Sequence, residues 1–390
     1  MKHRIVVLGA GYAGVHAAGR LARRLHPDDL SITLVNDAED FVERVRLHQL
    51  AAGQRLRGRP LRDVLAGTRV TPVTARVTAI DPDAGTVTLA GHHDLRFDTL
   101  VYALGSTGGD GGVPGVAEHA FGVAGRPAAL RLRDRLRTLG PGAAVLVVGG
   151  GLTGIEAVTE IAESWPDLRV ALVARGRAGD RLGDRARAHL HRALARLGVT
   201  VHEHTAVTRV GADGVHTGAG HLPAAVTVWT AGFAAHPIAA ASTLEVTDGR
   251  IVVDGTMRSV SHPAVYAVGD AAIAGGADGV PLRMACAAGI PMAWQAADAI
   301  AARLTGTRVV QRPIRFYAQC ISLGRRDGII QFVDAHDRAT PTVLLGAPAA
   351  RVKEFVCAGA AWSVAHPTLP APVRRRHVTT EPAAPAPATR

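Results

Sequence analysis

Cysteine is scarce in this 390-residue sequence, which contains only Cys286, Cys320 and Cys357. The three lie far apart and none belongs to a Cys-x-x-Cys pair, so the pattern argues against both a metal centre and a disulfide framework. We expect these residues to be small buried side chains or neutral surface residues.

Long apolar runs are lacking as well, and no stretch approaches the roughly 18–20 apolar residues that a membrane-spanning helix requires. No basic segment followed by an apolar one precedes the first apolar strand, which begins at Ile5. We therefore expect no signal peptide and a cytoplasmic location. Peripheral contact with the inner face of the membrane is left open but is not expected.

Aromatic residues make up 4% of the chain, and no basic cluster with interleaved aromatics occurs, although the formal net charge is +11. The basic residues are mostly scattered arginines, so we expect no nucleic-acid binding. The positive charge fits attraction to anionic cofactors or lipid headgroups better.

Glycine, in contrast, is abundant, and 44 glycines with 47% apolar residues are typical of an α/β protein with many turns. A short apolar strand over residues 5–8 is followed by a G-x-G-x-x-G turn over residues 9–14. In such a turn Gly9 permits the tight bend, Gly11 lets a pyrophosphate approach the backbone, and Gly14 lets strand and helix touch. The following helix offers its N-terminal amides to the phosphates.

The next segments predict the rest of a nucleotide-binding unit. A strand over residues 31–36 ends in Asn36, at the position where an acidic residue usually meets the ribose, so the site keeps a weaker ribose contact. Residues 41–53, which include Arg44, predict a helix. Residues 77–80 and 86–89 alternate around turn residues and predict a hairpin. Residues 97–105 predict another strand, and Gly108 to Gly112 with Pro114 predict a domain hinge or a surface loop.

A second glycine turn is the strongest single feature of the sequence. An apolar strand over residues 144–148 precedes Gly149-Gly150-Gly151-Leu152-Thr153-Gly154, and a further strand over residues 170–173 follows about one crossover later. Two such turns in matching contexts predict two bound dinucleotides. Ala174 replaces the acidic residue of an NAD site, with Arg175 and Arg177 beside it. These arginines either clamp the 2′-phosphate of NADP or are solvated loop residues.

Two further strands end near the predicted sites. Residues 224–233 predict a strand that leads into a small-residue turn, and residues 256–270 place Asp270 directly after an apolar strand and a glycine. Asp270 is therefore positioned to accept hydrogen bonds from a ribityl chain.

These motifs together resemble a known family. LGAGYAG, FDTLVYALGS, VVGGGLTGIE, VWTAGF and VYAVGD occur in the order found in FAD- and NAD(P)-dependent oxidoreductases with two dinucleotide-binding domains, the pyridine nucleotide-disulfide oxidoreductase superfamily. The chain is most similar to the type II NADH dehydrogenase-like branch, over residues 3–335. The resemblance implies an α/β fold with two Rossmann-like domains, in which the NAD(P) domain is inserted into a discontinuous FAD domain. The expected divisions are 1–110, 111–250 and 251–315, then a small strand-rich interface region over 316–365 and a disordered tail over 366–390.

The resemblance also implies a set of site residues. Glu156 would lie near the nicotinamide and the flavin as the catalytic group, although it is also explained as a carboxylate near a helix N-terminus. The helix expected between residues 282 and 304, with a kink or a late start at Pro291, would direct its N-terminus at the flavin. The residues expected to bind FAD or NAD(P)H are Gly9, Gly11, Tyr12, Ala13, Gly14, Asn36, Arg44, Ala103, Gly105, Gly149, Gly151, Thr153, Gly154, Arg175, Gly232, Gly269, Asp270, Ala285 and Cys286.

The sequence departs from the family in three places. The region near residues 41–53 lacks the redox cysteine pair of the disulfide reductases, and sulfide oxidation is disfavoured because no cysteine precedes Cys286. The quinone motif of type II dehydrogenases loses its first Gln, with only Gln295 left. A helical stripe of Val352, Phe355, Val356 and Ala360 predicts core packing or a dimer face in preference to membrane docking.

Three functions remain open at this point. The first is transfer of hydride from NAD(P)H to FAD and of electrons onward to a quinone or an aromatic metabolite, without a disulfide relay. The second is a soluble NAD(P)H-dependent flavoenzyme that acts on a specific metabolite or on oxygen. The third is a flavoprotein switch resembling apoptosis-inducing factor. A homodimer is compatible with each of them.

Overall fold

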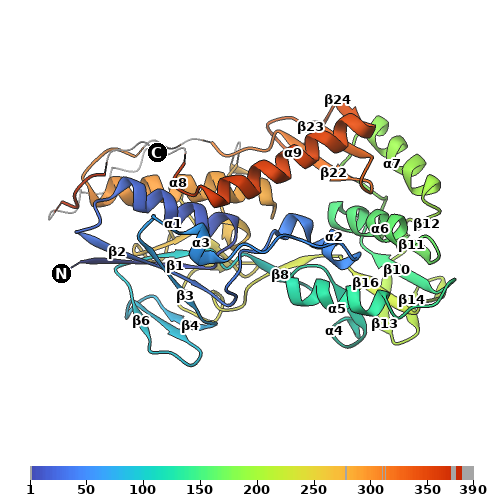
Figure 1. The fold of residues 1–390 in the computed structure, drawn as a ribbon, viewed down its shortest axis with the longest axis horizontal. Helices are drawn as coiled ribbons and strands as arrows, with labels where there is room; N and C mark the ends of the chain where they lie inside the picture. The colour runs from blue at the N-terminus through green and yellow to red at the C-terminus, as the bar shows by residue number, and fades with distance from the viewer. Residues whose placement is uncertain (1, 277–278, 310, 312, 370–374, 380–390) are drawn as a thin grey trace.

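The structure is a computed structural model that describes residues 2–276, 279–309, 311, 313–369 and 375–379. Two five-stranded parallel sheets organise these residues into two units, which lie at opposite ends of the long axis (Figure 1). The sheet of the first unit has the order β20 (Val265–Ala267), β7 (Thr99–Tyr102), β1 (His3–Leu8), β2 (Leu30–Asn36) and β3 (Val70–Thr74). The sheet of the second unit has the order β12 (Thr200–His202), β11 (Arg169–Val173), β10 (Ala144–Val148), β16 (Val226–Trp229) and β9 (Ala120–Gly122).

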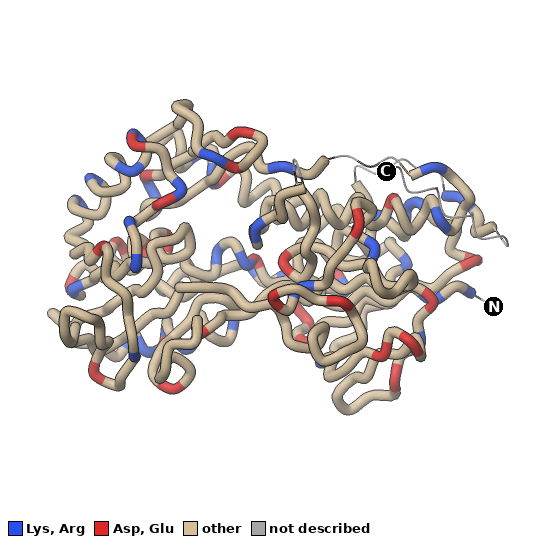
Figure 2. Tube along the Cα trace, turned by 180° about the vertical axis from the view of Figure 1, so that it is seen from behind, with Lys and Arg blue, Asp and Glu red and all other residues tan. Residues whose placement is uncertain are grey.

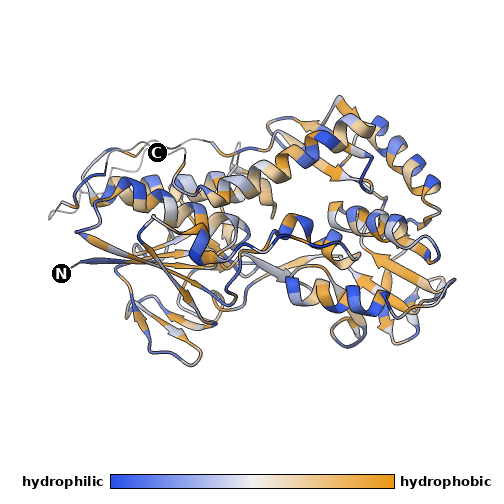
Figure 3. Ribbon diagram, in the orientation of Figure 1, coloured by the Kyte–Doolittle hydropathy of each residue, from blue (hydrophilic) through white to orange (hydrophobic). Residues whose placement is uncertain are grey.

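The central strands of both sheets are almost continuously apolar because helices and loops cover them. Leu8 in β1 and Val147 in β10 have no exposed surface, and both sheets are strongly apolar in Figure 3. In the first unit, α1 (Tyr12–Arg24) and α8 (Cys286–Leu304) pack against each other over the sheet (Figure 1). In the second, α6 (Leu152–Ser164) packs on β10 and β11, and α5 (Arg126–Leu136) packs on β9 and β16.

The chain order confirms the predicted fold class. β20 joins the first sheet beside β7 only after the whole second unit has been completed, so the first unit is discontinuous and the second is inserted into it. The antiparallel pair β8 (Ser106–Gly108) and β17 (Phe233–Ala235) connects the units. The segment predicted as a hinge therefore begins inside a paired strand, and its role as a hinge stays a prediction.

Shorter elements complete the two units. The small antiparallel or mixed sheets are β4 (Val77–Asp81), β5 (Thr86–Leu89) and β6 (Leu95–Arg96); β13 (Val207–Gly211), β14 (Gly214–Thr217) and β15 (Gly220–Pro223); β18 (Val246–Thr247), β19 (Arg250–Val252) and β21 (Ala272–Ile273); and β22 (Ala318–Ser322), β23 (Gly328–Val333) and β24 (Ala339–Leu345). The remaining helices are η1 (Arg44–Arg46), α2 (Leu47–Ala51), α3 (Leu61–Val64), α4 (Val116–His119), α7 (Asp184–Arg196), η2 (Gly269–Ala271) and α9 (Gly346–Ala365).

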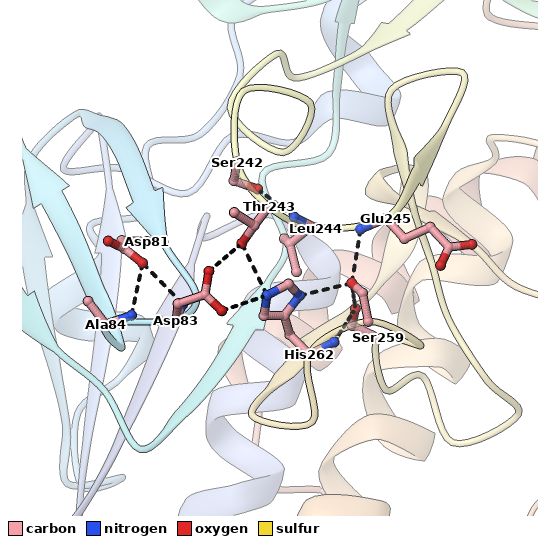
Figure 4. Close-up of polar contacts among 10 residues, drawn as sticks. Asp81, Asp83, Ala84, Ser242, Thr243, Leu244, Glu245, Ser259 and His262 are labelled. Atoms are coloured by element: carbon pink, nitrogen blue, oxygen red, sulfur yellow. Dashed lines mark hydrogen bonds and ion pairs between the residues drawn. The ribbon is translucent and has the colours of Figure 1, made fainter.

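The predicted hairpin is confirmed as β4 and β5, and a polar network fastens its turn to the rest of the first unit (Figure 4). One carboxylate oxygen of Asp83 lies 3.2 Å from Nε2 of His262, and the other accepts a hydrogen bond of 3.0 Å from the Thr243 hydroxyl. Nδ1 of His262 lies 2.9 Å from the Ser261 hydroxyl. The Asp83 side chain thus joins the hairpin turn to the segments that contain Thr243 and His262.

Three predicted elements are shorter than the sequence suggested. The predicted helix over residues 41–53 contains regular α-helix only in α2, because the Phe41 amide donates to the Arg59 carbonyl at 2.8 Å and holds the backbone extended. The strand predicted over residues 224–233 ends at Trp229, since the chain turns at Gly232 and then pairs with β8. The strand predicted over residues 97–105 is limited to β7.

Of the two predicted roles of the apolar stripe of α9, core packing is wrong, and a dimer face stays a prediction. Val352, Phe355 and Val356 are 39%, 79% and 48% exposed. The buried face consists instead of Ala349, Cys357, Ala361 and Val364, and Ala360 packs beside it. The buried face lies over β22, β23 and α1 and consists mainly of small residues.

Part of the tail predicted as disordered pairs with the first unit, and its disorder stays a prediction. Leu25 and Arg376 form a parallel β-bridge, in which the His26 amide donates to the Arg376 carbonyl at 2.8 Å. The rest of the predicted disordered tail, at 370–374 and 380–390, lies outside the described residues. Among the described helices none has the length and apolarity needed to cross a membrane. Lys and Arg are distributed over both units with Asp and Glu among them (Figure 2).

Candidate functional site

A cavity of about 490 Å³ lies at the carboxyl edge of the first sheet, beside the first glycine turn. The turn is built by close approach of backbone atoms. A Cβ on Gly9 would lie 2.4 Å from the Ala103 carbonyl oxygen, and a Cβ on Gly14 would lie 1.8 Å from the Gly9 oxygen. Gly9 also has a φ of +94°, which glycine adopts without strain. These two glycines therefore bring the loop, β7 and α1 into contact.

Gly11 differs from its two neighbours in the motif. It lines the cavity, and a Cβ placed on it would meet no atom within 4 Å. It is also the N-cap residue of α1, where amides without helical partners face outward. The open space and the helix N-terminus coincide, which is the arrangement that binds a phosphate group.

A polar relay crosses the floor of this cavity. Arg44 donates one hydrogen bond of 2.6 Å to the Ser106 carbonyl and another of 2.9 Å to the Ser106 hydroxyl. That hydroxyl donates in turn to a carboxylate oxygen of Asp270 at 2.6 Å. Arg44 also lies 5.4 Å from the ring centroid of Phe233, over its face. Arg44 and Asp270 are thereby held in fixed positions with opposite charges.

Asn36 lines the same cavity, but its amide is used within the protein. Its Oδ1 accepts a hydrogen bond of 2.9 Å from the Ala10 amide, and its Nδ2 donates one of 2.8 Å to the Ala38 carbonyl. Asn36 therefore stabilises the glycine turn. Asp37 follows it and also lines the cavity.

The N-terminus of α8 reaches the cavity beside that of α1. Ala285 is its N-cap residue, and both Ala285 and Cys286 line the cavity. The helix begins at Cys286 and continues through Pro291, so the late start predicted for it is wrong. Cys286 is exposed towards the cavity, yet the surrounding protein, followed by the Asp270 charge, raises the pKa of its thiol.

The sequence analysis missed several residues at this cavity. Ser106 is 4% exposed and completes the relay between Arg44 and Asp270. His236 lines the cavity from the chain after β17, and its Nδ1 is buried without a hydrogen-bond partner among the described residues. Burial lowers the pKa of His236. Ser106 ends the motif FDTLVYALGS but does not itself line the cavity, whereas no local pattern marks His236. The pairing of β8 with β17 brings the two residues near each other.

A second cavity, of about 520 Å³, lies at the carboxyl edge of the second sheet. Its glycine turn repeats the first in detail: a Cβ on Gly154 would lie 1.8 Å from the Gly149 oxygen, whereas one on Gly151 would meet nothing within 4 Å. Gly151 is the N-cap residue of α6. Gly149, Gly151 and Gly232 line the cavity, while Thr153 and Gly154 do not.

Arginines stand where β11 ends. Arg175 and Arg177 line the second cavity and are exposed. Neither side chain has a hydrogen bond or an ion pair with another described residue. Arg181, which also lines the cavity, pairs with Asp337 at 2.6 Å. Two cationic side chains are thus available for an anionic group at this position.

Glu156 lines neither of these two cavities. Its carboxylate lies 3.0 Å from Nζ of Lys353 in α9 and accepts a hydrogen bond of 3.0 Å from the Ser322 amide in β22. Nδ1 of His48, in α2, is 3.8 Å away. Burial alone would raise the pKa of Glu156, but Lys353, His48 and the Ser322 amide together lower it. Glu156 is therefore an anion within a buried cluster that we call the interunit ion cluster (Glu156, Lys353, His48).

The other predicted residues fall at the first cavity. Those that line it are Gly9, Gly11, Tyr12, Ala13, Asn36, Arg44, Ala103, Gly105, Gly269, Asp270, Ala285 and Cys286. Gly14 does not line the cavity, and its lack of a side chain lets α1 pack against the Gly9 carbonyl. The residues present fit a dinucleotide at each cavity, because each has a glycine whose Cβ would project into open space at a helix N-terminus.

Comparison with known proteins points the same way. The sequence profile of a family described as pyridine nucleotide-disulphide oxidoreductase matches residues 3–301. An NADH dehydrogenase-like protein of Mycobacterium tuberculosis (strain CDC 1551 / Oshkosh) is 33% identical over 383 residues, which cover 90% of this chain and 92% of that protein. A type II NADH:quinone oxidoreductase of Staphylococcus aureus (strain NCTC 8325 / PS 47) is 32% identical over 182 residues, or 43% of this chain and 45% of that protein.

Solved structures share the fold. NDH2 from Plasmodium falciparum in complex with NADH matches with a TM-score of 0.78 and 14% identity, over 94% of this chain and 97% of that one. The sulfide:quinone oxidoreductase from Aquifex aeolicus matches with a TM-score of 0.75 and 18% identity, over 94% of this chain and 92% of that one.

Proposed function

The chain belongs to the pyridine nucleotide-disulphide oxidoreductase family, and from this premise we propose that it transfers hydride from NAD(P)H to FAD and then electrons to a quinone-type acceptor. The family membership confirms the resemblance predicted from the sequence, and it makes the protein an oxidoreductase that uses a flavin and NAD(P)H. The proposal adds the identity of the flavin and the class of the acceptor.

The observation that carries the proposal is the pair of cavities. Each lies at the carboxyl edge of its own parallel sheet, next to a glycine turn that opens a helix. Ligands of doubly wound sheets bind in this position. Two such sites in one chain support two dinucleotides that exchange electrons.

FAD is assigned to the first cavity, where it would supply the two-electron chemistry between nicotinamide and acceptor. Gly11 leaves space for the pyrophosphate, and the amides of α1 face it. Asp270, fixed by Ser106 and Arg44, is placed to accept hydrogen bonds from a polyol chain. Arg44 and the N-terminus of α8 supply positive potential that favours an electron-rich ring.

NAD(P)H is assigned to the second cavity, at Gly149 and Gly151. Arg175 and Arg177 follow the end of β11 and line the cavity. Side chains at this position bind the 2′-hydroxyl of the ribose in NAD or its 2′-phosphate in NADP. A guanidinium suits a phosphate dianion, because it donates two parallel hydrogen bonds to it. We therefore propose that NADPH is accepted, and that Arg175 is the contact.

A small-molecule acceptor is proposed because the described residues offer no disulfide relay. Cys286, Cys320 and Cys357 are free thiols in the described structure, and burial raises the pKa of each. A relative that is 32% identical over 43% of this chain is a type II NADH:quinone oxidoreductase, which supports a quinone as the acceptor.

Anaerobic stopped-flow reduction of the purified protein with NADH and with NADPH tests the proposal. We expect rapid bleaching of a tightly bound flavin, identified as FAD after release, followed by rapid reoxidation when menadione is added. Preparations reconstituted with FAD that show no bleaching with either nucleotide would contradict the hydride transfer.

The reoxidation step separates the acceptors. Rapid bleaching with slow reoxidation by menadione would overturn the quinone and favour a dedicated metabolite; rapid reoxidation by oxygen would favour an oxidase. A long-lived reduced complex whose sedimentation coefficient changes would favour a nucleotide-controlled switch.

A further inference from the structure

A cluster of metal-ligating side chains lies away from both cavities, at the end of α1 remote from its glycine turn. His26 and Asp29 come from the turn between α1 and β2, and His377 comes from the C-terminal segment. One potential ligand atom from each residue lies within 4.8 Å of the other two. Neither the proposed cofactors nor the proposed acceptor uses these side chains.

The backbone holds the two segments together before any side chain is considered. The His26 amide donates to the Arg376 carbonyl at 2.8 Å, and the Arg376 amide donates to the Arg24 carbonyl at 2.9 Å. The Thr379 amide donates to the Leu304 carbonyl at 2.9 Å, at the end of α8. His26 and His377 are therefore presented from a fixed backbone register.

The three side chains lie close together. The imidazole rings of His26 and His377 stack with centroids 3.9 Å apart and an angle of 26° between planes. Nδ1 of His377 lies 2.9 Å from Oδ2 of Asp29. The same carboxylate oxygen accepts a hydrogen bond of 2.9 Å from the Val378 amide, so the ligand is oriented by a second group, as is common around protein-bound metals.

We propose that His26, Asp29 and His377 bind one divalent transition-metal ion of the zinc class. Two imidazoles and one carboxylate form a ligand set that suits Zn²⁺ and its neighbours. Ligand atoms around a tetrahedral zinc lie about 3.3 Å apart; Nδ1 of His377 and Oδ2 of Asp29 are 2.9 Å apart, and no two of the three ligand atoms are more than 4.8 Å apart. Asp28, whose carboxylate is 3.6 Å from Nδ1 of His26, or a water molecule completes the coordination.

The ion fastens the C-terminal segment to the first unit. The backbone hydrogen bonds described above already join residues 24–29 to residues 375–379, and His377 is 69% exposed. A metal that bridges the two segments adds a further link, whose binding free energy stabilises the docked segment. Trypsin cleavage after Arg375 or Arg376 would then become slower.

Isothermal titration of Zn²⁺ into the full-length protein, freed of any affinity tag and of metal, tests the site. We expect one site per chain in the wild type, and an affinity lower by about tenfold or more in His377→Ala and in Asp29→Asn. His93→Ala, an exposed histidine in the turn after β5, is the control and should titrate like the wild type. Zinc should also slow trypsin cleavage of the wild type and not of His377→Ala.

Two results would overturn the site. One is the absence of a stoichiometric zinc site in the wild type. The other is an unchanged zinc affinity in both His377→Ala and Asp29→Asn, because the metal would then be bound by other histidines among the 18 in the chain. Flavin content and flavin reduction are not part of this test, so its outcome is independent of the proposed function.

Discussion

The three glycines of each turn act in two different ways. A side chain on Gly9 or Gly14 would collide with backbone within the protein, whereas a side chain on Gly11 would enter the cavity without touching protein atoms. Substitution of Gly11 therefore separates ligand binding from folding. The φ of Gly11 is −74°, which any residue adopts.

The variant Gly11→Val is expected to lose its flavin while it keeps the wild-type fold, because the valine side chain occupies the space left for the pyrophosphate. The ratio of flavin to protein absorbance, with far-ultraviolet circular dichroism for the fold, measures this. Gly140→Val, at another glycine whose Cβ would meet nothing within 4 Å, is the control. Full flavin content in Gly11→Val would refute the assignment of the first cavity.

Arg175 tests the second cavity. Arg175→Glu replaces a cation by an anion at the proposed phosphate contact, so the KM for NADPH should rise roughly tenfold or more while the KM for NADH stays near the wild-type value. Arg131→Glu, an exposed arginine on α5, makes the same charge change elsewhere. An unchanged ratio of the two KM values would show that Arg175 is a solvated loop residue.

His16 in α1 predicts a pH dependence of stability. Its side chain has no exposed surface, and burial followed by the charge of Arg20 lowers its pKa to about 4. The unfolded chain therefore binds a proton near pH 6.5 that the folded protein takes up only near pH 4. The contribution of neutral His16 to the free energy of unfolding is fully present above pH 6.5. It is lost as the pH drops towards 4, and the loss is on the order of 3 kcal/mol.

Urea unfolding at several pH values checks this expectation. His16→Phe keeps an aromatic ring in the site and should lose this part of the decline, while Ser363 retains its bond to the Ala360 carbonyl. If the free energies of unfolding of the wild type and His16→Phe depend on pH in the same way, His16 does not titrate as its burial requires.

At the scale of elements, α9 shows how a helix turns its small residues inward. Val364 has no exposed surface, whereas Val352 is 39% exposed on the same helix. The exposed large apolar side chains, Phe355 and Val356 among them, leave a face available for a second protein or a membrane surface. The choice between these partners stays a prediction.

Matched substitutions measure the orientation of this helix. Val364→Ala should lower the free energy of unfolding by roughly 2 kcal/mol more than Val352→Ala, because only Val364 leaves a cavity. The gain in helix propensity is the same at both positions and cancels in the difference. Equal effects in denaturant unfolding would mean that α9 does not pack as described.

At the scale of the whole molecule, two kinds of contact hold the units together. The β8–β17 pair carries the chain between them, and the interunit ion cluster joins α6 of the second unit to α9, which also packs on α1 of the first unit. Lys353 also donates to the Cys320 carbonyl at 3.0 Å. Burial alone would lower the pKa of Lys353, but Glu156 raises it, so each charge depends on the other.

Glu156→Gln should therefore destabilise the protein by about 3 kcal/mol, because it leaves Lys353 buried without its counter-charge. Thermal unfolding at equal flavin saturation measures the loss. Glu354→Gln, which removes an exposed partner of Arg46, should cost at most about 1 kcal/mol. A Glu156→Gln protein of wild-type stability whose flavin is reduced slowly would instead support direct participation in catalysis.

The sequence by itself determined what depends on consecutive residues. A strand, a glycine turn and a helix follow one another within about twenty residues at both sites; their spacing predicted the two nucleotide-binding units, and the family resemblance of these motifs implied the fold class. The tertiary structure decided what depends on distant residues. Ser106 between Arg44 and Asp270, the orphaned nitrogen of His236, the buried pair of Glu156 and Lys353, and the meeting of His26 with His377 all join segments far apart in the chain. Hydrophobic periodicity marks which face of an element is apolar, but the neighbour that covers it is set by packing of the whole chain.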